Sequence, residues 1–158
     1  MEQPLDSAAG ALGRAMRVYG VLLALATTTF VWLPEVARWP PYHPPYERMF
    51  VAIFFAWGLC LYRAARAPRH NLGLVDFTAL QGLLHGGVMA ADVVQGHAGH
   101  HGAWHLIGDV PLHLSAPVVL GLLRHRVEPY RVGLTRGEAL LFLGVFGVCV
   151  AVALFGLE

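Results

Sequence analysis

The chain has 158 residues, of which 56% are hydrophobic and 13% are charged, and it contains no lysine. A soluble domain of this length would expose more charge, so the composition favours a protein embedded in lipid. The formal net charge of +1 argues against a nucleic-acid partner, because such a partner calls for a concentrated basic surface.

Five apolar segments follow one another, at about 13–33, 47–66, 72–94, 104–123 and 138–157. Each has roughly twenty residues, which at about 1.5 Å per residue crosses a hydrocarbon core of about 30 Å. We therefore predict an all-α fold, with a cytoplasmic tail at 1–12 and one domain of five transmembrane helices at 13–158. The first segment is predicted to be a retained anchor, since Trp32-Leu33-Pro34-Glu35 offers no small-residue cleavage site for a signal peptidase.

The arginines are distributed unequally between the two sides of these segments. Nine of the eleven fall on one side, and only two fall on the other, at 38 and 48. The positive-inside rule therefore predicts a multi-pass protein of the bacterial inner membrane, with a cytoplasmic N-terminus and an external C-terminus.

The first outer loop, at 34–46, is rich in proline and aromatic residues. Because proline lacks a backbone N–H group, Pro40, Pro41, Pro44 and Pro45 are expected to prevent a helix there. A stiff cap on the outer membrane surface is the simplest interpretation.

The third predicted helix carries polar residues at helical spacing, namely Thr78, Gln81, His85, Met89 and Asp92. Spacings of three and four place them on one stripe, whereas Asp76 belongs to another face and is expected to pair with a nearby arginine. Ionisable residues are costly inside a bilayer, so a stripe of this kind usually faces a partner or a cavity.

The fourth helix carries His101, His105, Asp109 and His113, each four residues apart. A short outer loop makes the third and fourth helices antiparallel neighbours. Counting inward from the outer ends then places Asp92 level with Asp109, and His85 level with His113.

Imidazoles and carboxylates that converge from different helices suit zinc, copper or iron. We expect a metal site in the outer half of helices two to four. The first-choice ligands are His85, His105 and Asp109, and the second-choice ligands are Glu47, Asp92 and His113. The histidine-rich loop at 96–104 would hold such a metal loosely above the site.

Other interpretations of the same residues remain open. One is a structural polar seam that joins helices, as in an accessory subunit of a larger membrane complex or a homo-oligomer. Another is a pathway for protons or a small molecule. His85 and His113 also meet the minimum for haem b ligation. Gly82 and Gly86 would then make room for the macrocycle, although this small-x-x-x-small pattern more often serves close helix contact.

An enzymatic role is also open. A membrane metallohydrolase needs three protein ligands, a water position and a general base, and His85, His105 and Asp109 with Glu47 or Asp92 meet that description. The sequence has no phosphate-binding glycine loop and no Gly-x-Ser-x-Gly motif, and nothing in it indicates a substrate.

Three short motifs carry a family resemblance: Arg66-Ala-Pro-Arg-His70, His85-x-x-Val-Met89, and His105-Leu-Ile-Gly-Asp-Val-Pro111. Together they resemble a family of small bacterial integral membrane proteins of unknown function, over roughly residues 39–126. The resemblance implies a membrane fold and draws attention to His85, His105 and Asp109, but it implies no reaction.

Overall fold

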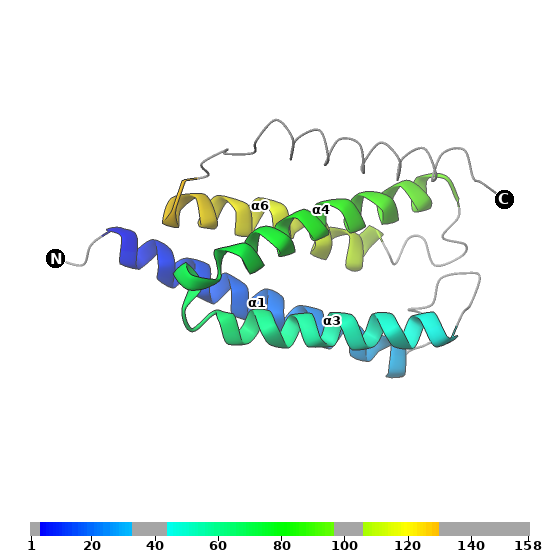
Figure 1. Cartoon of the computed structure of the whole chain (residues 1–158). Helices are drawn as coiled ribbons and strands as arrows, with labels where there is room; N and C mark the ends of the chain where they lie inside the picture. The colour runs from blue at the N-terminus through cyan, green and yellow to red at the C-terminus, as the bar shows by residue number, and fades with distance from the viewer. Residues whose placement is uncertain (1–3, 33–43, 97–105, 130–158) are drawn as a thin grey trace, which may run out of the picture.

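The computed structural model describes residues 4–32, 44–96 and 106–129. These residues form four α-helices, α1 (Pro4–Trp32), α3 (Pro44–Ala64), α4 (Leu72–Val94) and α6 (Asp109–Val127), and a short 3₁₀ helix, η1 (Pro68–Asn71). The described part of the chain contains no β-strand. The helices run along a common direction (Figure 1), α1 packs chiefly on α3, and α4 packs chiefly on α6. An all-helical fold is therefore confirmed.

Helix α1 begins nine residues before the predicted boundary at residue 13, so most of the expected tail is helical. Pro4 stands at the first helical position, where its missing N–H group costs nothing, and Asp6 lies in the first turn. The Asp6 carboxylate also accepts a hydrogen bond from Arg69, at 3.0 Å. Local helix propensity and this contact explain the longer helix.

The expectation that Pro44 and Pro45 prevent helix formation is wrong, because α3 begins at Pro44. Proline is tolerated in a first turn, whose N–H groups have no partner within the helix. Helix α4 has the predicted bounds of 72–94. Helix α6 spans 109–127, against the predicted 104–123. The fifth predicted helix, at 138–157, lies outside the described residues.

Glycines allow α1 and α3 to approach closely. A Cβ atom added to Gly20 would lie 2.7 Å from the Gly58 carbonyl oxygen, and one added to Gly58 would lie 2.6 Å from the Gly20 oxygen. Real Cβ atoms essentially never come this near to backbone. Small residues at such a crossing are typical of helix pairs that gain contact by bringing their backbones together.

The core lies between the four helices. Its largest fully buried side chains come from all of them: Leu12, Met16, Leu61, Val75, Thr78 and Leu120. The predicted ion pair of Asp76 is confirmed. Its partner is Arg124 of α6, whose Nε donates to Oδ1 at 2.9 Å, and the Arg124 side chain is only 11% exposed.

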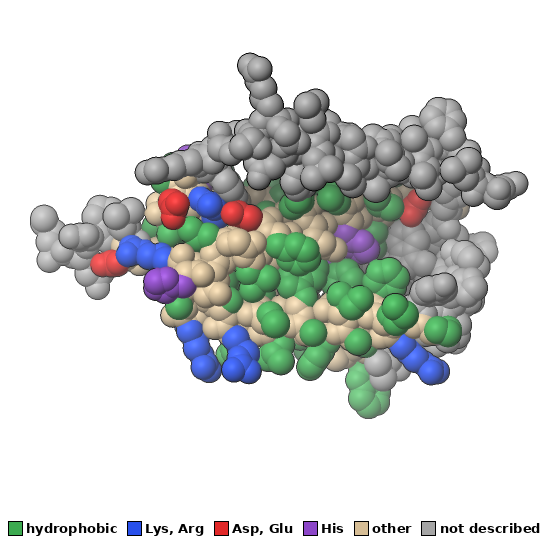
Figure 2. Space-filling model, viewed as in Figure 1, with side chains coloured by type: hydrophobic (Ala, Val, Ile, Leu, Met, Phe, Trp, Pro, Cys, Tyr) green, Lys and Arg blue, Asp and Glu red, His purple; other side chains and the backbone are tan. Residues whose placement is uncertain are grey.

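The outer surface of the helices is strongly apolar. Twenty-two large hydrophobic side chains are exposed among the described residues, and Figure 2 shows apolar side chains spread along the middle of the visible face. Two segments, Asp6–Thr28 and Pro68–Val94, are long and apolar enough to cross a membrane. No more than a third of either segment's most apolar window is buried inside the bundle.

Candidate functional site

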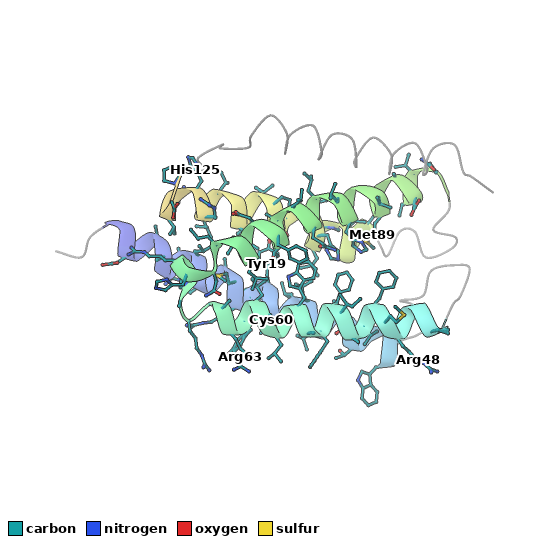
Figure 3. All side chains as sticks on the ribbon, viewed as in Figure 1. Tyr19, Arg48, Cys60, Arg63, Met89 and His125 are labelled. Carbon is teal, nitrogen blue, oxygen red and sulfur yellow. The ribbon has the colours of Figure 1, made fainter. Side chains whose placement is uncertain are left out.

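The polar stripe predicted on the third helix lies on α4. Thr78 is 1% exposed and Met89, labelled in Figure 3, is 8% exposed. Gln81, His85 and Asp92 are half-buried. The spacing of these residues therefore correctly predicted a face that turns towards the other helices.

Two imidazoles from different helices meet in this region. The ring centres of His85 on α4 and His113 on α6 are 4.6 Å apart, and the ring planes are inclined by 71°. His113 is 7% exposed, whereas His85 is half-buried. This contact confirms that the two histidines lie at the same depth on facing helices.

Gly82 and Gly86 of α4 allow this close approach. A Cβ atom on Gly82 would lie 2.5 Å from the backbone oxygen of His113, and one on Gly86 would lie 3.0 Å from the Cβ atom of His113. Pro117 has no N–H group to bond that oxygen within α6, so the freed carbonyl lies against the Gly82 backbone. The close-packing interpretation of the glycine pattern is therefore confirmed.

Aromatic side chains of α3 form a wall along one side of the imidazole pair. The ring of Phe54 lies 5.5 Å from that of His85 and 5.7 Å from that of His113, measured between centres. Trp57 lies 5.5 Å from Phe54, and its Nε1 donates a hydrogen bond to Thr78 Oγ1 at 3.0 Å. The imidazole pair therefore has apolar surroundings on the side of α3.

Sequence reasoning did not single out Phe54 and Trp57. They stand three residues apart in the second predicted helix, level with the middle of the third. Aromatic residues at that spacing also face lipid or an ordinary core, so the pattern alone could not identify them.

Two further polar features were not predicted. Tyr19 of α1, labelled in Figure 3, donates a hydrogen bond to Ser115 Oγ of α6 at 2.7 Å. Ser115 in turn donates to the carbonyl oxygen of Leu112 at 2.9 Å. In the described part of the chain, the Oε1 atom of Gln81 is buried and accepts no hydrogen bond. The bond from Tyr19 to Ser115 extends the polar contacts between the helices beyond the two histidines.

The structure describes the remaining predicted ligands only in part. The backbones of Glu47 and Asp109 lie at the beginnings of α3 and α6, but their side chains lie outside the described residues. His105 and the histidines of the 96–104 loop lie outside them as well. Asp92 is seven residues beyond His85 on α4, which is about 10 Å along the helix axis. Within the described ranges, no three His, Cys, Asp or Glu side chains converge as a metal site would require.

The imidazole pair nevertheless has a spacing that suits a shared ion. Two imidazole nitrogens at about 2.0–2.1 Å from one tetrahedral zinc ion put their ring centres roughly 5 Å apart. The observed separation of 4.6 Å is slightly shorter than that value, and it is also a normal distance for edge-to-face ring packing. Haem suits it less well, because axial imidazoles lie on opposite faces of the macrocycle and do not touch each other.

No curated protein and no solved structure matches this chain. One family model does match, described as a family of unknown function (DUF6632), and it covers residues 8–141. The match is longer than the resemblance over 39–126 and includes the whole of α3, α4 and α6. The chain belongs to this family of unknown function.

Proposed function

We propose that the chain is a multi-pass protein of the bacterial inner membrane that binds one transition-metal ion between α4 and α6. The observation that carries the metal proposal is the contact of His85 with His113 across two helices, in surroundings that are apolar on the α3 side.

The surface of the bundle supports a membrane location. Exposed apolar patches beyond a few hundred Å² are unusual on soluble monomers, yet large apolar side chains remain exposed on all four described helices. Described arginines gather at the end where α1 begins, and Arg48 lies at the opposite end, as Figure 3 shows for Arg63 and Arg48. This favours five spans with a cytoplasmic N-terminus, the fifth at 138–157.

The positions of the two helices also indicate where further ligands would come from. Asp109 is the first residue of α6, four residues before His113 and therefore one turn away. His105 precedes it by four residues more. Met89 lies four residues beyond His85 and is buried. Imidazole and carboxylate suit zinc or iron, and a thioether would favour copper.

Metal analysis of the purified protein tests the proposal. We expect the full chain in neutral detergent to bind about one ion of added zinc per molecule, as in other single structural or catalytic sites. His85→Ala and His113→Ala should each abolish this binding after desalting. His70→Ala is the matched control, because His70 is exposed in η1, away from the pair. Equal zinc content in all four proteins would refute the metal site.

A second candidate is an accessory subunit whose polar contacts only join helices. The hydrogen bonds from Trp57 to Thr78 and from Tyr19 to Ser115 favour it, because such bonds hold membrane helices together without any ion. Under this alternative, the His85 and His113 variants would lose thermal stability while the wild-type protein would bind no zinc.

A further inference from the structure

A cavity of about 430 Å³ opens beside the first half of α1, where α1 meets the end of α3 and the segment that follows it. Its walls combine small residues with three arginines. The lining residues are Ala9, Gly10, Gly13, Arg14, Arg17, Ala65, Arg66 and Pro68. We call it the arginine pocket.

Within the described ranges, nothing compensates the charge of the arginine pocket. None of the described residues that line it is acidic. Asp6, the acidic residue of the first turn of α1, instead pairs with Arg69, which lies outside the pocket. Among the described residues, Arg14, Arg17 and Arg66 form no ion pair. Three guanidinium groups around one concavity repel one another, and a bound anion would relieve that repulsion.

Gly10 lines the pocket without a side chain. A Cβ atom there would be in ordinary van der Waals contact with Arg14 Nη1, at 3.8 Å. The guanidinium of Arg14 therefore lies beside the exposed α1 backbone at Gly10. Gly13 differs, because a Cβ atom there would lie 2.9 Å from the carbonyl oxygen of Ala65. Gly13 thus serves helix contact, whereas Gly10 presents exposed backbone to the pocket.

Two rows of exposed apolar side chains lead away from the arginines. On α1, Val21 and Leu25 follow Arg17 at intervals of four residues. On α3, the row that precedes Arg66 has intervals of four, three and four residues and consists of Tyr62, Leu59 and Phe55. All five side chains are 43–57% exposed. Such intervals keep each row on one side of its helix. Helix α1 packs on α3, and Gly20, next to Val21, lies against the backbone of Tyr62, so the two rows meet beside this crossing.

We propose that the arginine pocket binds the phosphate group of an anionic phospholipid, whose acyl chains lie along these two rows. A phosphate between arginines forms strong, charge-assisted hydrogen bonds. The apolar rows distinguish an amphiphile from a free phosphate ion, since a soluble anion would gain nothing from them. This inference rests on the membrane location proposed above and is independent of the metal site.

Native mass spectrometry of the full chain in neutral detergent tests the inference, with phosphatidylglycerol as the probe and phosphatidylcholine as the neutral counterpart. We expect preferential binding of phosphatidylglycerol. The double variant Arg14→Gln/Arg66→Gln should weaken it about tenfold or more, since each arginine near anionic lipid contributes a severalfold factor. The matched double variant Arg63→Gln/Arg126→Gln removes the same charge outside the pocket and should change binding only about twofold.

Gly10→Leu distinguishes binding of the lipid in the arginine pocket from general electrostatic attraction between arginines and anionic lipid. It keeps every charge and favours helix formation, but its side chain would project into the pocket beside Arg14. We expect it to weaken phosphatidylglycerol binding as much as the arginine double variant does. Unchanged binding in Gly10→Leu, or equal loss in the two double variants, would refute the arginine pocket as the binding site.

Tight binding of inorganic phosphate that displaces the lipid would refute the lipid as its ligand. Release of the chain from cell membranes by alkaline carbonate would instead refute the membrane location itself.

Discussion

Replacement of Gly82 by alanine tests the close approach of α4 and α6 on which the imidazole pair depends. The new Cβ atom would lie 2.5 Å from the backbone oxygen of His113 and 3.1 Å from the Ala116 Cβ atom. Ordinary contact begins at 3.4 Å. The two helices must therefore separate by about 0.9 Å at this point, because the obstructing atom belongs to backbone and cannot rotate away.

Overpacking of this kind costs about 1–3 kcal/mol, whereas replacing glycine in a helix stabilises it by about 1 kcal/mol. Gly87→Ala provides the control. It lies on the same helix, and an added Cβ atom there would meet nothing within 4 Å. The gain in helix propensity is common to both variants, so Gly82→Ala should be less stable than Gly87→Ala by about 1–3 kcal/mol.

The assay is thermal unfolding of the purified variants in one detergent, followed by circular dichroism. For a chain of this size, each kcal/mol shifts Tm by roughly 2–4 °C. We expect Gly87→Ala to unfold at or above the wild-type temperature and Gly82→Ala below it. If the two variants unfold at the same temperature, α4 and α6 do not touch at Gly82, and the reasoning for the imidazole pair fails with it.

Two other contacts give predictions of different size. Asp76→Asn removes the charge that faces the nearly buried guanidinium of Arg124, and it should lower the unfolding free energy by about 1–3 kcal/mol. Asp6→Asn changes an ion pair whose side chains are 46% and 66% exposed. It should lower the unfolding free energy by less than about 1 kcal/mol. Denaturant titration of both variants measures the contrast, and equal losses would contradict it. Trp57→Phe keeps an aromatic ring but removes the hydrogen bond to Thr78. Thr78 Oγ1 still donates to the Leu74 carbonyl oxygen, so the loss should be about 0.5–1.5 kcal/mol. A loss that persists when Thr78 is already valine would show that the bond is not the cause.

Much of α4 could be predicted from the sequence. Its boundaries, its polar stripe and the close contact at Gly82 all follow from helical periodicity and from residue size. The partner of Asp76 was predicted only as a nearby arginine, because the choice of Arg124 depends on how α4 and α6 align. Their alignment could be estimated by counting inward from the helix ends, which is why the two histidines were matched correctly.

The helix beginnings were less predictable. Pro44 and Pro45 were interpreted as helix breakers, although a first turn accepts proline because its N–H groups lack partners in any case. Residues 1–12 were interpreted as a tail because they are polar and rich in small residues, but such residues can still form a helix, and α1 begins at Pro4. The aromatic wall of Phe54 and Trp57 was missed because it depends on tertiary contacts that leave no distinct sequence pattern.

The imidazole pair is tested most directly by X-ray absorption spectroscopy of the zinc-loaded protein at the zinc edge. We predict scattering from at least two imidazole rings at about 2.0–2.1 Å. His85→Gln and His113→Gln should each lose the bound zinc and with it the imidazole scattering, whereas His70→Gln should give the wild-type spectrum. A zinc spectrum that contains no imidazole, or that is identical in all three variants, would show that the 4.6 Å contact between these rings is helix packing and not a metal site.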